Sequence, residues 1–285
     1  MRPAPREVRA HGARLRAACA LILVAASFAS GDTAIRDKRG VEMVLVPAMT
    51  FTMGDLDAGA DAQPIHRVTL SSFYIDRTEV TCAQFRAFLL ENPEWQHGRA
   101  RAPLVDSDYL RGWDGLSYPC GRDDYPVTWV SWSAAAAYAA WRGARLPTEA
   151  EWEATVRGTD GRPYPWGTTP PDAGEAPRCN YRRAPAGQGA SGPMPVGGFP
   201  AGASPFGALD MAGNVWEWVA DWHDPEYYAE SPTSDPQGPA NGTYRVVRGG
   251  SWSVPAPWLR CSIRLRAYPT RSSDQVGFRC ARSAE

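Results

Sequence analysis

The chain has 285 residues, and its 30 Lys+Arg against 31 Asp+Glu give a formal net charge of -1. This near-neutral balance argues against a nucleic-acid or anionic-membrane partner, because such partners require an excess of basic residues. A hydrophobic content of 44% is enough for a packed core, and 12 Trp, 27 Gly and 26 Pro indicate a loop-rich domain held together by aromatic anchors.

The first thirty residues have the pattern of a signal peptide. Five arginines precede an apolar run over residues 17–29, which is too short to cross a bilayer comfortably. Small residues at Ser27 and Ala29, or at Ala29 and Gly31, offer cleavage sites, and an uncleaved membrane anchor is the alternative. We expect residues 1–30 to be a signal peptide that sends the protein to the periplasm or outside the cell, with no other membrane segment.

The first predicted elements after this segment are strands. Residues 43–47 and 51–54 predict two strands that pair through a turn. Residues 68–75 carry strand-forming side chains in rough alternation and predict one further strand.

Three helices are predicted from their capping residues. The first starts at Thr81 and the third at Thr148, because each threonine is followed three residues later by Gln or Glu in a capping box. Ser131 or Ser133 caps the second helix, and a glycine follows the second and the third.

Beyond the third helix the chain becomes irregular. Pro and Gly recur, and short strands are expected near residues 244–247 and 278–281. Few long elements and much loop indicate an α+β fold. Loops of this length need aromatic anchors, disulfides or bound metal to hold them.

Five cysteines remain after the predicted signal peptide: Cys82, Cys120, Cys179, Cys261 and Cys280. The chain has no C-x-x-C pair, which excludes zinc knuckles and thioredoxin-like redox motifs. An oxidising compartment favours disulfides, but an odd number leaves one thiol free or paired between molecules.

Eight segments follow one another along the chain: MVLVPAMTFTMGD, FYIDRTEVTCAQF, YPVTWVSWSAAAAYAAW, RLPTEAEWEATVRG, YPWG, LDMAGNVWEWVADW, RVVRGGSW and VGFRCA. In this order they resemble the formylglycine-generating enzyme, or sulfatase-modifying factor, family. The resemblance implies a single domain over residues 40–285 with a C-type-lectin-like fold and little regular secondary structure.

Enzymes of this family oxidise a sulfatase cysteine to formylglycine with O2 and Cu(I), which two cysteines after the GGSW motif hold. Cu(I) prefers such thiolate ligands. Here Val254 matches the first copper position, and Cys261 is the only thiol in the following loop. Cys261 matches a structural cysteine of the animal-type enzymes, whereas a different gap placement moves it onto the second copper position. Copper is therefore not expected, and Ser251, Trp252 and Cys261 remain as groove candidates.

The resemblance also bears on disulfides. In the animal-type enzymes the cysteines that match Cys261 and Cys280 pair with cysteines at positions occupied here by Val156 and Ala139. Because both partners are missing, these two cysteines pair with each other, pair with another cysteine, or stay reduced.

The family also binds structural Ca2+, and one of its sites matches the segment LDMAGNVWEW. The resemblance implies carboxylate ligands from Asp210 and Glu217 and backbone carbonyl ligands from Gly213 and Val215. The alternative is that the two carboxylates only accept backbone N–H groups in a Trp-lined turn.

The other conspicuous side chains have structural interpretations. Glu149, Glu151 and Glu153 lie at a helix start, which attracts acids electrostatically. Most tryptophans are expected in the core. Ser251 has no His nearby in the sequence to act as its base.

Family membership does not by itself fix function. We expect an exported binding or accessory module that does not generate formylglycine, with a peptide or protein ligand in the family's groove. The alternative is an enzyme that acts on a protein or peptide in the same groove, by formylglycine generation or another oxidative modification.

Overall fold

The structure is a computed structural model, and it describes Met1 and residues 34–119, 121–174, 176–182 and 191–284. Apart from Met1, the predicted signal peptide of residues 1–30 lies outside the described residues, as does Cys120. In the part of the chain that is described, no helix has both the length and the apolar character needed to cross a bilayer.

Helices make up a small part of the chain. The α-helices are α1 (Cys82–Glu91), α2 (Trp132–Trp141), α3 (Glu149–Arg157) and α4 (Tyr227–Glu230), and the 3-10 helices are η1 (Ala60–Ala62), η2 (Pro93–Trp95), η3 (Pro200–Gly202) and η4 (Ala256–Leu259). Both predicted capping boxes form, at Thr81 and at Thr148. Ser131 caps α2 by accepting the Ala134 backbone N–H, and Ser133 lies inside that helix.

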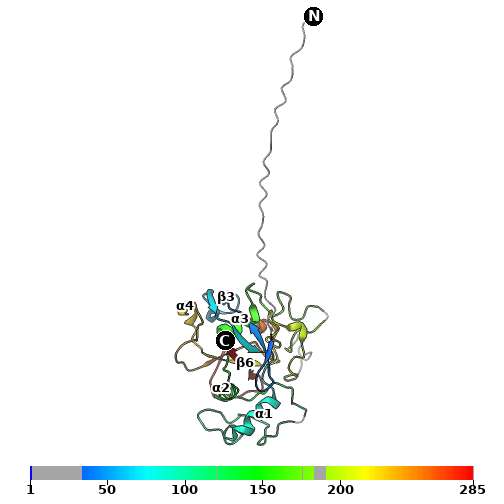
Figure 1. Cartoon of the computed structure of the whole chain (residues 1–285), viewed down its shortest axis with the longest axis vertical. Coiled ribbons are helices and arrows are strands. Elements are labelled where there is room, and N and C mark those ends of the chain that lie inside the picture. Colours follow the sequence, from blue (N-terminus) through cyan, green and yellow to red (C-terminus); the bar gives the residue numbers. More distant parts are fainter. Residues whose placement is uncertain (2–33, 120, 175, 183–190, 285) are drawn as a thin grey trace. The chain divides into compact units, whose positions relative to one another are not determined.

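The strands form three small sheets. The strands are β1 (Ala34–Arg36), β2 (Glu42–Val46), β3 (Met49–Met53), β4 (His66–Leu70), β5 (Phe73–Asp76), β6 (Trp216–Trp222), β7 (Arg245–Arg248), β8 (Arg264–Ala267), β9 (Val276–Phe278) and β10 (Ala281–Ser283). Their orders are β1-β2-β5-β10, β3-β4 and β8-β7-β6-β9. Only the β6–β9 pair is parallel among the described strands. In the folded unit, α1 lies at one end and α3 and β6 lie near the middle (Figure 1).

Two strand predictions were wrong. Residues 43–47 and 51–54 do form strands, but β2 pairs with β1 and β5 whereas β3 pairs with β4. Residues 68–75 do not form one strand, because the chain leaves the β3–β4 sheet at Ser71 and enters another sheet as β5. The cause is the Asp235 carboxylate, which accepts both the backbone N–H and the hydroxyl of Ser71 at 2.8 Å.

The folded unit begins before the predicted domain start at residue 40. Strand β1 pairs antiparallel with β2 from Ala34 onward, so these residues belong to the same sheet. Three residues are too few to give a periodic signal in a sequence.

The core has two main hydrophobic clusters. One surrounds α1 and α2, where the Phe85 and Tyr138 rings stack with centroids 5.7 Å apart. The other surrounds Trp152 of α3, which is fully buried and donates its indole N–H to Glu217 at 2.8 Å. Helix α3 is therefore packed on all sides, although it carries four charged residues.

The charges of α3 are satisfied by buried arginines from the β7–β8 region. Arg248 binds Glu149 at 3.1 Å and Glu153 at 2.5 Å, and Arg264 binds Glu149 at 2.7 Å. Burial alone raises the pKa of Glu149, but Arg264 and Arg248 hold that pKa below its usual value. Glu151 closes the capping box of the helix. The structural interpretation of the three glutamates is confirmed, and ion pairing contributes to it in addition to the helix dipole.

Candidate functional site

The RGGSW motif forms a tight turn directly after β7. Gly249 and Gly250 have φ values of +98° and +81°, and a Cβ at Gly250 would lie 2.9 Å from the Leu259 side chain. Glycine is therefore required here by both conformation and space. Ser251 follows, is fully buried, and its hydroxyl hydrogen-bonds with Gln275 and Ser253 at 3.3 and 3.2 Å. The Ser251 hydroxyl therefore holds the turn in place and faces no open cavity.

The position that matches the first copper ligand is filled by packing. The Val254 side chain packs against the core clusters, its N–H donates to the Ser251 carbonyl, and its own carbonyl accepts the Arg182 N–H. A valine side chain has no ligand atom. The residues present at this position do not fit copper.

Cys261 lies in the core and not in the groove. Its side chain is 2% exposed, and its thiol lies 3.9 Å from the Val156 carbonyl oxygen. Val156 occupies the position of the structural cysteine partner in the animal-type enzymes, so this contact favours the structural match for Cys261 over the copper match. Burial raises the pKa of the Cys261 thiol, and the thiolate that copper requires is disfavoured.

The other described cysteines also lie in the core. Cys82 and Cys280 are buried free thiols, as is Cys261. Cys280 belongs to the same core cluster as Ala139, the position of its missing partner. Burial raises the pKa of Cys82 to about 12 and that of Cys280 well above its ordinary value. These thiols therefore serve as core side chains and not as nucleophiles.

The three described histidines all have partners outside the loop after GGSW. His66 stacks edge-on against Tyr228, His97 contacts the Tyr109 carbonyl, and His223 contacts the Asp61 carboxylate. None of these partners lies in the loop.

A cavity of 290 Å³ lies beside the GGSW turn, and we call it the groove pocket. Its walls include the aromatic side chains Trp113, Tyr125 and Trp129, the cation Arg111 and the acid Asp274. It adjoins the motif because the Trp252 indole N–H points to the Asp274 carbonyl oxygen at 3.4 Å. Aromatic walls with a few polar groups are typical of ligand pockets.

The groove pocket is built on strained backbone. Trp129 has φ = +58°, and Leu110, whose N–H donates to the Trp129 carbonyl at 2.7 Å, has φ = +50°. Large side chains rarely adopt this left-handed conformation, and such strain clusters at binding and catalytic sites. The Arg111 guanidinium lies 5.4 Å from the centroid of the Trp129 ring. Two neighbouring strained residues thus place an aromatic face and a cation on the same wall.

The predicted calcium turn contains a surplus of buried acids. Glu79, Asp210 and Glu217 surround Arg279, and all three carboxylates are buried. Arg279 binds both oxygens of Glu217 at 2.7 Å, and Trp152 donates to the same carboxylate. Glu217 therefore serves first as the partner of a buried arginine.

Two oxygens in this cluster lack a hydrogen bond from any described residue: Asp210 Oδ1 and Glu79 Oε2. Burial is the main cause that raises the pKa of both Glu79 and Asp210. A proton shared by the two carboxyls, or a cation bound between them, balances the charge. No group of three or more His, Cys, Asp or Glu in the described chain is arranged to hold a metal ion.

The acid pair fits a hard cation in charge and in donor type. Of the predicted carboxylate ligands, Asp210 keeps an oxygen without a hydrogen bond, whereas Glu217 is held by Arg279. Gly213 lies at the same turn with φ = +81°, and a Cβ there would come within 2.2 Å of the Asn180 carbonyl oxygen. Calcium binding at this turn stays a prediction. Glu79 is a further candidate ligand that the sequence analysis did not include.

Comparison with known proteins agrees with this geometry. A family model described as the sulfatase-modifying factor enzyme 1-like domain matches residues 30–284. The formylglycine-generating enzyme of Streptomyces coelicolor is 39% identical, over 88% of this chain and 91% of that protein. The hercynine oxygenase of Mycolicibacterium smegmatis is 37% identical, over 84% of this chain and 60% of that protein. The solved structure of PvdO from Pseudomonas aeruginosa superposes with a TM-score of 0.72 at 30% identity, covering 88% of this chain and 98% of that one.

These matches define the class first: an α+β, C-type-lectin-like fold of the formylglycine-generating-enzyme type. The chain belongs to the sulfatase-modifying factor (FGE-sulfatase) family. The expected fold class and family are therefore confirmed.

Sequence reasoning missed several residues of the site. Arg111 and Trp129 lie in the long connection between η2 and α2, Asp274 lies between β8 and β9, and only the tertiary structure brings them together. Glu79 stood within a recognised motif, but its burial beside Asp210 left no signal in the sequence. Of the three groove candidates, the structure places Trp252 beside the pocket, whereas Ser251 is buried in the turn and Cys261 in the core.

Proposed function

We propose that this protein is a binding module of the family that holds a peptide segment in the groove pocket and does not generate formylglycine. The observation that carries the proposal is that the loop after GGSW does not offer the two thiols that would hold copper. The position that matches the first copper ligand holds a packed valine, Val254, and the nearest thiol in the sequence, Cys261, is buried against Val156. Aromatic walls and the Arg111 guanidinium beside the turn support binding of an extended segment with acidic or aromatic side chains.

The first test is chemical. The purified protein is incubated with Cu(I), O2 and a peptide that contains the CxPxR sequence, and the peptide is then weighed by mass spectrometry. We expect no aldehyde product, because the loop after GGSW has only one thiol, Cys261, and cannot supply a thiolate pair to hold the metal. The 39% identical enzyme of Streptomyces coelicolor, run in parallel, serves as the positive control. Robust turnover by this protein would overturn the proposal.

The second test is binding of a defined panel of fluorescent peptides. Thr128 lines the groove pocket, so Thr128→Trp fills it, whereas Thr52→Trp adds the same side chain to an exposed position of β3. We expect peptide binding to the wild type and to Thr52→Trp but not to Thr128→Trp. Equal binding by both variants, or no binding by the wild type, would contradict a peptide site in this pocket.

The alternative is an enzyme that modifies a substrate in the same pocket. The 37% identity to a hercynine oxygenase favours it, although this chain spans 60% of that protein. A panel peptide whose mass changes without the protein retaining it would support this alternative. Export through residues 1–30 is likewise a proposal, and N-terminal sequencing of the protein from its host checks it.

A further inference from the structure

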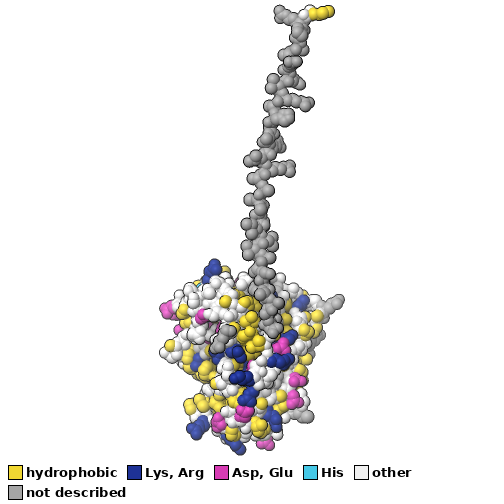
Figure 2. All heavy atoms as spheres, viewed as in Figure 1, with side chains coloured by type: hydrophobic (Ala, Val, Ile, Leu, Met, Phe, Trp, Pro, Cys, Tyr) yellow, Lys and Arg dark blue, Asp and Glu magenta, His cyan; other side chains and the backbone are white. Residues whose placement is uncertain are grey.

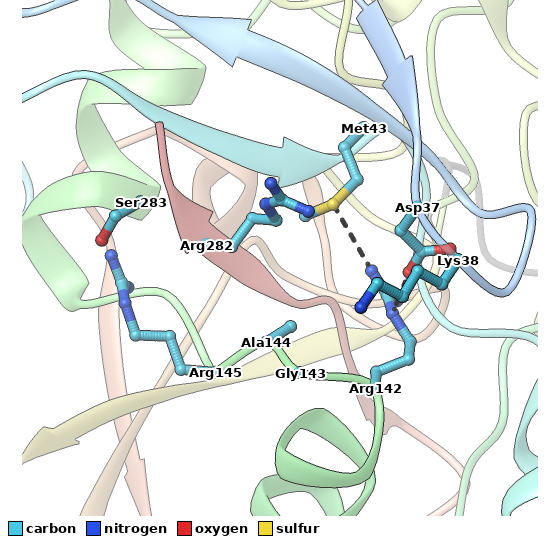
Figure 3. Close-up of a pocket in the computed structure, with 9 residues that line it drawn as sticks. All are labelled: Asp37, Lys38, Met43, Arg142, Gly143, Ala144, Arg145, Arg282 and Ser283. Atoms are coloured by element: carbon cyan, nitrogen blue, oxygen red, sulfur yellow. Dashed lines mark hydrogen bonds and ion pairs between the residues drawn. The ribbon is translucent and has the colours of Figure 1, made fainter. Parts of the chain in front are cut away.

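A second and larger cavity lies away from the GGSW turn, and we call it the cationic pocket. Its volume is 510 Å³, within the range of small-molecule sites. Its walls come from three places: the β1–β2 turn with Asp37 and Lys38, the loop after α2 with Arg142 and Arg145, and the end of the chain at β10 with Arg282 (Figure 3). Four of these five side chains are basic.

Two of the basic residues are already neutralised. Arg142 is fully buried and bound by Asp37 at 2.8 Å and by Asp76 at 2.6 Å. Arg145 donates two hydrogen bonds to the Glu151 carboxylate, each 2.6 Å long. These pairs fix the back wall of the pocket, and because their charges cancel they add little attraction for a ligand.

The other two basic residues have no acidic partner. Lys38 and Arg282 are both exposed, and neither forms an ion pair with any residue in the described ranges. Arg282 lies opposite Tyr74 in the sheet and 5.9 Å from the centroid of its ring. In Figure 3 Lys38 and Arg282 approach from different sides, and the Arg145 guanidinium lies beside the Ser283 hydroxyl. The pocket thus combines two free cations, a hydroxyl and a held guanidinium around one space.

Overall charge does not explain this arrangement. The chain has a formal net charge of -1, and Figure 2 shows basic and acidic side chains interspersed on the visible face. An unpaired excess of two cations in one hollow is therefore a local feature. Guanidinium and ammonium groups around a polar cavity are the usual means by which proteins bind phosphate and carboxylate oxygens.

We propose that the cationic pocket is a binding site for a small polyanion that carries at least two oxyanion groups, such as a diphosphate. One oxyanion lies between Lys38 and Arg282, and the other reaches the Ser283 hydroxyl. The volume accommodates a molecule larger than a single phosphate. The site shares no lining residue with the groove pocket, so a failure of the proposed peptide binding would not contradict it.

The composition of the chain provides a direct test, because Lys38 is its only lysine. An acetylating N-hydroxysuccinimide ester can therefore react with only two kinds of amine, the Lys38 side chain and the α-amine of the purified protein. Pyrophosphate is the probe, and peptide mass spectrometry measures both labelling rates at constant ionic strength. At a pyrophosphate concentration of about twice its Kd we expect Lys38 labelling to slow about threefold, with the α-amine unaffected.

Two matched variants distinguish binding in the cationic pocket from general electrostatic screening of Lys38 by the anion. Arg282→Gln removes a pocket cation, and Arg67→Gln removes an exposed arginine of β4 that does not line the pocket. We expect Arg282→Gln to lose the protection of Lys38 and Arg67→Gln to keep it, with equal melting temperatures. Inorganic phosphate, which has one oxyanion group, is expected to protect more weakly at equal concentration. Unchanged labelling of Lys38, equal slowing of the α-amine, or equal behaviour of the two variants would overturn the proposal.

Discussion

The loop over residues 249–261 and the helix α3 both carry family motifs, yet the fold depends much less on the side chains of the loop than on those of the helix. In the loop, the position that matches a metal ligand holds Val254, which packs against neighbours and leaves the turn intact. Around α3, every charged residue has an ion-pair partner, and Arg248, which binds Glu153 at 2.5 Å, is fully buried. The loop can therefore lose its chemistry without losing its fold, whereas a buried charge cannot be removed alone without leaving its partner unpaired.

The largest effect should follow from breaking the network at α3. Arg248→Met leaves Glu153 with only Arg157 and Glu149 with only Arg264, and we expect a loss of about 3 kcal/mol or more in the free energy of unfolding. Urea denaturation followed by circular dichroism measures it. Val254→Ala in the loop is the counterpart, and it should cost only about 1 kcal/mol. Similar losses from both variants would remove the contrast between the two regions.

A second prediction concerns the acid pair of Glu79 and Asp210. If calcium binds there, Ca2+ at about 100 times its Kd raises the free energy of unfolding by about 2.7 kcal/mol, and a chelator removes this gain. Thermal melting with calcium, with magnesium and with a chelator measures the effect. Asp210→Asn should abolish the calcium effect, and so should Glu79→Gln. An identical melt with and without chelator would show that a shared proton, and not a cation, balances the pair.

The third prediction is a pH dependence that arises beside α3. Burial, and after it the charge of Glu149, raises the pKa of Asp221 to about 8, while its carboxylate accepts the Glu149 backbone N–H. The folded protein then keeps a proton that the unfolded chain releases near pH 4. The free energy of unfolding therefore falls as pH rises from about 4 to about 8, by up to about 1.4 kcal/mol per pH unit.

Asp221→Asn removes this proton and keeps an oxygen acceptor for the Glu149 N–H. We expect the variant to lose that slope in urea unfolding measured between about pH 5 and pH 8. Asp114→Asn, at an exposed position, is the control and should keep the slope. A wild-type slope that survives in Asp221→Asn would assign the proton to another group, with Glu79 as the first alternative.

The elements with local signals could be predicted from the sequence. Capping boxes at Thr81 and Thr148 are decided by residues three positions apart, so they form as expected. The motif series identified the family and the fold class for the same reason, since each motif is a contiguous segment. The valine at the position that matches the first copper ligand was an equally local signal, because Val254 lies two residues after GGSW.

Features that join distant segments were decided only by the tertiary structure. The pairing of β2 with β5 and β1 depends on which edges meet in space, and Asp235 interrupts residues 68–75 from a point 164 positions away. The groove pocket, the acid pair and the cationic pocket each combine separate loops or strands, whose side chains approach only after folding. Hydrophobic pattern and capping act over a few residues, whereas burial of a charge depends on everything packed around it. The sequence by itself therefore determined the family and the helices α1, α2 and α3, and the tertiary structure decided which side chains face a cavity and which only hold the fold.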